Sequence, residues 1–153
     1  MRADASASTN ALAREGTVLA FDFGTRKIGV ALGNTLLRNA RALTTVRAES
    51  NEVRFAAIAT LIAEWSPVQL VVGAPVHADG TPHDMTRRAE RFARQLEGRF
   101  GLPVARVDER HTTRAAAAQL SSEGIHGEAR RAMQDEVAAT LMLQAWFDEA
   151  NHA

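Results

Sequence analysis

The sequence predicts an α/β domain in which a mixed five-stranded sheet carries helices on both faces. Three short apolar runs come first, at residues 18–23, 28–32 and 40–46, and their short connections favour an antiparallel meander. From residue 50 onward, apolar residues at helical spacing alternate with two further apolar runs, at 68–73 and 103–107. Such alternation is typical of parallel strands covered by helices. A chain of 153 residues is long enough for one domain of this kind.

The first half of the chain is built around a hairpin. Residues 1–16 are small and polar without an apolar period, so we expect a disordered tail before a folded domain at residues 17–150. The turn Gly24-Thr25-Arg26-Lys27 separates the first two apolar runs and predicts that they pair. Ser50 is suited to cap a helix, and Ser66-Pro67 is suited to end it, so the first helix lies between them.

The second half alternates helices and strands. Thr81 and Pro82 are suited to begin a second helix, because they supply a cap and a favourable first residue. The outer face of that helix carries Arg87, Arg91 and Arg94, which we interpret as a solvated surface. After the fifth strand we expect three further segments: a helix at residues 113–122, a loop at 123–131 and a final helix at 133–148.

Composition excludes several classes of function. The chain has no cysteine, which excludes disulfides and thiolate metal sites, and it shows no secretory segment near its start, so we expect a cytoplasmic protein. No apolar stretch reaches the roughly 20 residues that a membrane span needs. The 18 basic and 18 acidic residues cancel, which counts against nucleic-acid binding through a global positive field. The five histidines lack zinc spacing, and no phosphate-binding loop or nucleophile elbow is present.

Asp22 lies inside the first apolar run, where an ionised side chain is difficult to explain. Removing an unpaired carboxylate from water costs several kcal/mol, or else raises its pKa until the group is neutral. A tolerated Asp22 therefore needs hydrogen-bond donors, a cationic partner or a metal ion.

Two further acids stand at the ends of predicted elements. Glu109 follows the fifth strand, and Asp135 falls in the first turn of the predicted last helix, on the apolar face that carries Met142. Each acid alone has a simpler explanation, since Glu109 can pair with Arg110 and Asp135 can complement the helix dipole. Three convergent carboxylates, however, suffice to hold one or two Mg²⁺ ions against a phosphate, which is the chemistry of phosphodiester hydrolysis.

Four segments carry motifs in a recognisable order: F-D-F-G-T-R-K-I-G-V-A at 21–31, V-V-G-A-P at 71–75 with D-G-T at 79–81, D-E-R-H-T-T at 108–113, and D-E-V-A-A-T-L-M-L-Q at 135–144. Their order and spacing resemble those of the YqgF family, also called RuvX, over residues 17–148. Members of that family are described as Holliday junction resolvases and as nucleases that process the 5′ end of pre-16S ribosomal RNA. The resemblance implies an RNase H-like domain, active-site acids at Asp22, Glu109 and Asp135, a Mg²⁺ or Mn²⁺ cofactor, and a role in ribosome biogenesis in the cytoplasm.

We therefore predict a metal-dependent endonuclease that acts on structured RNA as a monomer or weak homodimer, with Asp22, Glu109 and Asp135 as metal ligands. Contacts to substrate phosphates are expected from the following basic residues: Arg26, Lys27, Arg110, Arg114 and Arg130. Three alternatives stay open. They are a nuclease for junction DNA, a non-catalytic factor that binds ribosomal RNA, which the zero net charge favours, and a sugar-kinase-like phosphotransferase. The motif D-F-G-T suggests the last, but the chain is too short for its two domains.

Overall fold

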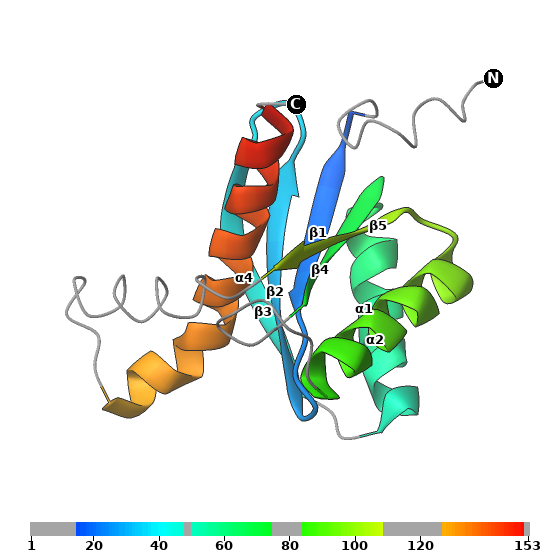
Figure 1. Ribbon diagram of the computed structural model, residues 1–153, viewed down its shortest axis with the longest axis vertical. Helices are drawn as coiled ribbons and strands as arrows, with labels where there is room; N and C mark the ends of the chain where they lie inside the picture. Colours follow the sequence, from blue (N-terminus) through cyan, green and yellow to red (C-terminus); the bar gives the residue numbers. More distant parts are fainter. Residues whose placement is uncertain (1–14, 48–49, 75–83, 109–126, 152–153) are drawn as a thin grey trace.

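The computed structural model describes residues 15–47, 50–74, 84–108 and 127–151, and at residues 74, 108, 127–136 and 150–151 it describes the backbone alone. These residues form a five-stranded sheet of order β3-β2-β1-β4-β5 with three helices packed on it (Figure 1). The mixed α/β sandwich predicted from the sequence is thereby confirmed.

The sheet combines a meander with two parallel additions. The central strand β1 (Thr17–Asp22) pairs antiparallel with β2 (Lys27–Asn34), which in turn pairs antiparallel with β3 (Asn39–Arg47). On its other side, β1 pairs parallel with β4 (Gln69–Ala74), and β4 pairs parallel with β5 (Val104–Asp108). Because β1, β4 and β5 are parallel, their C-terminal ends lie at the same edge of the sheet. In open α/β sheets, ligands commonly bind at this edge.

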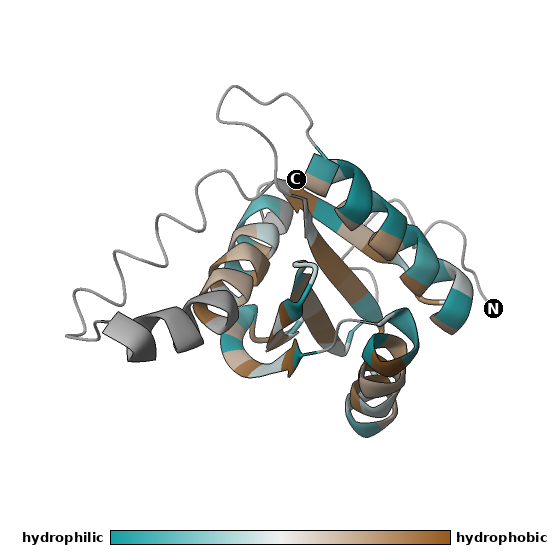
Figure 2. Cartoon of the chain, turned by 90° about the horizontal axis from the view of Figure 1, so that it is seen from below, coloured by the Kyte–Doolittle hydropathy of each residue, from teal (hydrophilic) through white to brown (hydrophobic). Residues whose placement is uncertain are grey.

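The helices cover both faces of the sheet. Figure 1 shows α1 (Asn51–Trp65) and α2 (Asp84–Phe100) on one face and α4 (Gly127–Asn151) on the other. Figure 2 shows the hydrophobic strands enclosed between these layers, while α2 presents a mostly hydrophilic surface. None of the helices in the described part of the chain is long and apolar enough to cross a membrane.

Strand β1 is apolar on both sides because both of its faces are covered. Leu19 and Phe21 belong to the core beneath α1 and α2, whereas Val18 and Ala20 belong to the core beneath α4. All four side chains are fully buried. This alternation follows from the two-residue period of a strand and confirms that the first apolar run has no solvated face.

The predicted limits of α1 are confirmed. The Ser50 side chain accepts a hydrogen bond from the backbone N–H of Val53, and Ser66 ends the helix in a left-handed conformation with φ of 47°. In α2, Asp84 lies in the first turn, where an acidic side chain is favourable. The expected cap Thr81 and the following Pro82 lie outside the described residues, as does the helix expected at 113–122.

The start of the last helix differs from the sequence prediction. Helix α4 begins at Gly127, whereas we predicted a loop to residue 131 and a helix from Met133. The segment after Gly127 is rich in Glu, Ala and Arg, which are strong helix formers, and their propensity outweighs that of the two nearby glycines. Asp135 is therefore about two turns inside the helix, and the prediction that it lies in the first turn is wrong.

Candidate active site

The candidate active site is built around Asp22, the last residue of the central strand. Its neighbours across the sheet are Gly29 on β2 and Gly73 on β4. Because neither neighbour carries a side chain, no side chain of β2 or β4 stands directly beside the carboxylate on this face of the sheet. Asp22 is anomalous in the sequence itself, whereas these two glycines can be assigned as its neighbours only when the strand register is known.

Asp22 is half-buried, whereas the four residues before it in β1 are fully buried. Strand alternation places it on the same face as Val18 and Ala20, which is the face covered by α4. Phe23, the next residue, packs on the opposite face, against Phe92 of α2. The carboxylate thus stands at the edge of the core rather than within it, so its desolvation cost is lower than full burial would impose.

The strand that leads to Glu109 ends at the same edge of the sheet as Asp22, with β4 between them. In the register of the sheet, Asp22 is level with Gly73, and Gly73 is level with Val107 of β5. The end of β5 is thus two strands from Asp22, or about 10 Å. Strand β5 ends at Asp108, and Glu109 follows it directly but lies outside the described residues.

The helix that carries Asp135 packs on the face of the sheet to which Asp22 belongs. Position 135 is four residues, about one turn, before Ala139, which is buried together with Met142 against Val18 and Ala20. The backbone at 135 therefore continues the buried side of α4 toward its start. The Asp135 side chain itself is outside the described part of the structure.

A divalent metal site remains a prediction. Among the side chains that the structure describes, no group of three His, Asp or Glu residues is placed to hold a metal ion. Of the three predicted ligands, only the side chain of Asp22 belongs to that set. The convergence of Asp22, Glu109 and Asp135 is thus neither supported nor contradicted by the described side chains.

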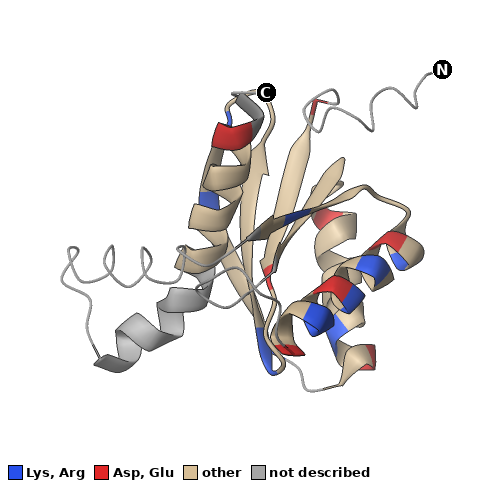
Figure 3. Ribbon diagram, in the orientation of Figure 1, with Lys and Arg blue, Asp and Glu red and all other residues tan. Residues whose placement is uncertain are grey.

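Two of the predicted phosphate contacts lie next to Asp22. Arg26 is exposed in the turn that joins β1 to β2, and Lys27, the first residue of β2, is half-buried. Figure 3 shows this basic turn close to the start of α2, which carries several more basic residues. Arg110 and Arg114 lie outside the described residues, and the Arg130 side chain is likewise not described.

Arg54 is a feature of this region that the sequence analysis missed. It is buried, with only 8% of its surface exposed. Its guanidinium donates hydrogen bonds to the backbone carbonyl oxygen of Thr25 at 2.6 Å and to Oδ1 of Asn51 at 3.1 Å. Burial lowers the pKa of Arg54, because removal from water disfavours the charged form. In the sequence, the position of Arg54 beside the apolar Phe55 in a predicted helix was the one indication that it could be buried.

Comparison with known proteins identifies the family. The sequence model of RuvX, described as "Holliday junction resolvase", matches residues 16–149. The chain belongs to the RuvX family. A RuvX relative from Dechloromonas aromatica (strain RCB) is 56% identical over 137 residues, which cover 90% of this chain and 94% of the relative. A second, from Burkholderia vietnamiensis (strain G4 / LMG 22486), is 54% identical over 141 residues, which cover 92% and 95%. Both carry the name "Putative pre-16S rRNA nuclease".

Solved structures place the RuvX chain among RNase H-like resolvases in fold. RuvC of T. thermophilus, solved with a Holliday junction substrate, superposes with a TM-score of 0.54 at 17% identity, over 88% of this chain and 94% of RuvC. The Fowlpox virus resolvase, solved with Holliday junction DNA, also gives a TM-score of 0.54, at 6% identity, over 87% and 97%. At these identities the likeness concerns the fold alone. The RNase H-like domain implied by the sequence motifs is confirmed.

Proposed function

We propose that this RuvX-family chain is a nuclease that hydrolyses phosphodiester bonds of structured RNA, with the 5′ end of pre-16S ribosomal RNA as its substrate in the cytoplasm. The observation that carries the proposal is the position of Asp22, a half-buried carboxylate at the end of the central strand. It faces the helix that bears Asp135 and lies two strands from the end of β5. The names of the two relatives described above supply the substrate.

Asp22, Glu109 and Asp135 are the proposed metal ligands and catalytic residues. Carboxylate oxygens are the donors that Mg²⁺ and Mn²⁺ prefer, and the chain has no cysteine that would favour a softer metal. When bound, such an ion lowers the pKa of a water molecule and stabilises the charge that develops on the phosphate. The phosphate is proposed to bind at this strand end, where the neighbours of Asp22 are two glycines without side chains.

The basic residues of the chain are proposed to orient the nucleic acid. Arg26, in the turn that follows Asp22, and Lys27, the first residue of β2, are proposed to contact phosphates near the cleaved bond. Arg110, Arg114 and Arg130 are proposed to contact more distant phosphates, because Arg110 and Arg114 follow Glu109 in the sequence and Arg130 precedes Asp135 within α4. A local arrangement of this kind can bind RNA although the net charge of the chain is zero.

Replacement of one carboxylate tests the proposal. Asp22→Asn keeps the size of the side chain but removes its charge, so we expect Mn²⁺-dependent cleavage of a 5′-extended 16S RNA fragment to fall by at least about a hundredfold. The matched control is Asp148→Asn, an exposed carboxylate in the last turn of α4. Unchanged cleavage by the Asp22 variant, with thermal stability equal to the wild type, would contradict the proposed role.

A second candidate function is cleavage of four-way DNA junctions, which the description of the RuvX family model favours. Cleavage of a synthetic junction and of the RNA fragment is compared for the wild-type protein, with the same two variants as controls. This comparison decides between the substrates. Preferential cleavage of the junction would replace the RNA proposal. Binding of RNA without turnover of either substrate would instead indicate a non-catalytic factor.

A further inference from the structure

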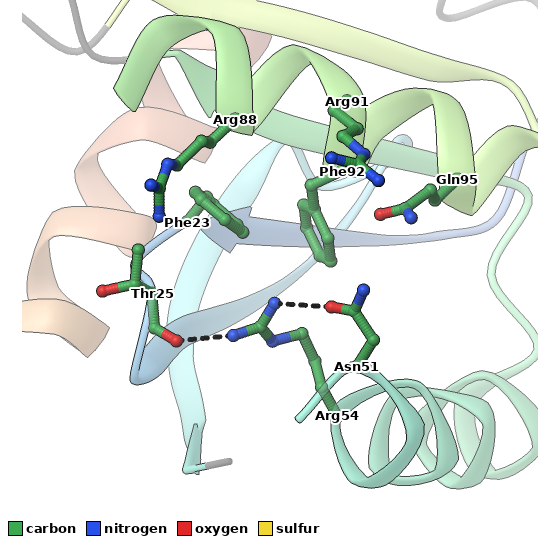
Figure 4. A pocket seen from close by; sticks show the side chains of 8 residues that line it. All are labelled: Phe23, Thr25, Asn51, Arg54, Arg88, Arg91, Phe92 and Gln95. Carbon is green, nitrogen blue, oxygen red and sulfur yellow. Dashed lines mark hydrogen bonds between the residues drawn. The ribbon is translucent and has the colours of Figure 1, made fainter. Parts of the chain in front are cut away.

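A pocket of about 350 Å³ lies between α1 and α2, beside the start of the β1–β2 turn (Figure 4). Its volume is at the lower end of the range of small-molecule sites, about 300–1,000 Å³. Among the described residues, two phenylalanines, three arginines and three neutral polar residues line it: Phe23, Thr25, Asn51, Arg54, Arg88, Arg91, Phe92 and Gln95. Asp22 is not among the described residues that line it.

The pocket is strongly cationic. Three of the described residues that line it are arginines. No Asp or Glu is among the described lining residues. Arg88 pairs with Asp84 at 3.0 Å, but both side chains are more than half exposed, so this pair is weak and can be displaced by a stronger anion. Arg91 is exposed at the rim. These charges favour an anion inside the pocket.

Arg54 gives the pocket a fixed donor. Its guanidinium lies 5.6 Å from the centre of the Phe23 ring and donates hydrogen bonds to the Thr25 carbonyl oxygen and to the side-chain amide oxygen of Asn51. Figure 4 shows the guanidinium facing the space between the two helices. A buried, oriented guanidinium binds a phosphate oxygen more strongly than a mobile surface charge, because less side-chain entropy is lost on binding.

The pocket and the candidate active site share one strand end. Asp22 lies on the α4 face of the sheet, and Phe23 lines the pocket on the opposite face. Thr25 lines the same pocket and directly precedes Arg26 in the exposed turn. A nucleic-acid strand that crosses this turn would pass from the carboxylate to the pocket with basic side chains along its path.

We propose that this pocket binds a phosphate group of the substrate strand, on the face of the sheet opposite Asp22. The proposal rests on the proposed nuclease function and extends it with a second contact point for the RNA. The arginines bind the phosphate, while the side-chain amides of Asn51 and Gln95 are placed to contact the attached sugar or base. The phosphate is either an internal phosphodiester or a terminal 5′ phosphate, since both offer the same oxygens.

A pair of double variants with equal change in charge tests the proposal. Arg88→Gln with Arg91→Gln removes two charges that line the pocket, whereas Arg87→Gln with Arg94→Gln removes two exposed charges of α2 that do not line it. Each double variant also removes one i,i+4 ion pair, Arg88 with Asp84 or Arg94 with Glu90. The two proteins are therefore matched in charge, helix and expected stability.

Binding of a fluorescent 5′-extended 16S RNA fragment is measured by anisotropy without divalent ions, in the Asp22→Asn background and at several salt concentrations. We expect the pocket variant to bind about tenfold more weakly and to lose about one unit of salt slope, while the control changes less than about threefold. Equal weakening by both double variants would overturn the proposal and indicate general surface charge. Because no cleavage is measured, this result is independent of whether Asp22 is catalytic.

Two further measurements locate the phosphate. The first compares the binding of 5′-hydroxyl RNA and 5′-phosphorylated RNA to the wild type. Equal affinity indicates that the pocket binds an internal phosphodiester, and weaker binding of the 5′-hydroxyl RNA indicates that it binds the terminal phosphate. In ¹H–¹⁵N spectra, the Arg54 Nε resonance, assigned with Arg54→Lys, should shift when the RNA is added. If that resonance stays in place while RNA is bound, the phosphate does not occupy the pocket and the proposal fails.

Discussion

The guanidinium of Arg54 in α1 donates a 2.6 Å hydrogen bond to the backbone carbonyl oxygen of Thr25 in the β1–β2 turn. This bond joins two segments that are 29 residues apart in sequence. It holds α1 against the turn that begins two residues after Asp22. The position of the basic turn beside the candidate active site therefore depends on a side chain of a helix that does not itself carry a proposed catalytic residue.

Removal of this side chain should weaken the fold. Arg54→Ala leaves the Thr25 carbonyl without this donor, and we expect a loss of about 1–3 kcal/mol in the free energy of unfolding, measured with urea. Arg87→Ala, an exposed arginine of α2, should change it by less than about 0.5 kcal/mol. If both variants are equally stable, the contact with Thr25 does not contribute to the free energy of unfolding.

The β1–β2 turn should also be sensitive to the size of residue 24. A Cβ atom at Gly24 would lie 2.5 Å from the backbone oxygen of Lys27, so the turn must change shape to accept alanine. We expect Gly24→Ala to lower the free energy of unfolding by about 1–3 kcal/mol. Gly98→Ala is the contrasting variant, because no atom lies within 4 Å of its added Cβ in α2. It should raise stability by about 0.5–1 kcal/mol.

Most strand and helix limits were predictable because their signals are local. The apolar run of β1 and the serines at the two ends of α1 specify these elements within a residue or two. The start of α4 was placed six residues late, since Glu128 to Met133 contains no residue that either caps or breaks a helix decisively. Asp22 was identified because a carboxylate in an apolar strand is anomalous in the sequence itself.

The remaining features depend on tertiary contacts that sequence patterns do not contain. Arg54 is buried because Thr25 and Asn51 supply its acceptors, and Thr25 belongs to another element. The glycines beside Asp22 become meaningful only through the register of β1 with β2 and β4. The arginine pocket exists because α1 and α2 lie side by side on one face of the sheet. The sequence predicts that Arg91 is solvated, but it does not reveal that Arg91 lines a pocket.

An ion-pair group between β5 and α2 should make stability depend on pH. Arg106 of β5 pairs with Glu90 and Glu97 of α2, each at 2.9 Å. The hydrogen bond from Arg106 lowers the pKa of Glu90 below its ordinary value of 4.5. A carboxylate with a lowered pKa stabilises the fold above that ordinary value and loses this contribution as the pH falls through the folded-state pKa.

A double-mutant cycle with Glu90→Gln and Arg106→Gln measures this effect. We expect a coupling of about 0.2–1 kcal/mol at pH 7, because all these side chains are partly exposed and screened by water. The coupling should shrink steadily as the pH is lowered below 4.5. A coupling that is constant between pH 7 and the acid limit of folding would show that the charge of Glu90 is not its source.

The packing of α4 on β2 should tolerate no side chain at residue 33. A Cβ at Gly33 would lie 2.7 Å from Cε2 of Phe147 and 2.8 Å from the backbone oxygen of Asn39. Gly33→Ala should therefore lower the free energy of unfolding by about 1–3 kcal/mol and increase hydrogen exchange in α4. Unchanged exchange in α4 together with lower stability would place the strain in β3 instead.

The salt dependence of RNA binding should reveal whether Arg26 contacts phosphate. Each phosphate contact contributes about 0.7 to 0.9 units to the slope of log K against log salt, because binding releases condensed counterions. Arg26→Gln should reduce the slope by that amount, measured in the Asp22→Asn background so that the RNA stays intact. Arg38→Gln is the matched control, since Arg38 is also exposed but lies in the β2–β3 turn at the other end of β2. Equal slopes for the two variants would remove the β1–β2 turn from the RNA-binding surface, and the path proposed between Asp22 and the arginine pocket would lose its middle contact.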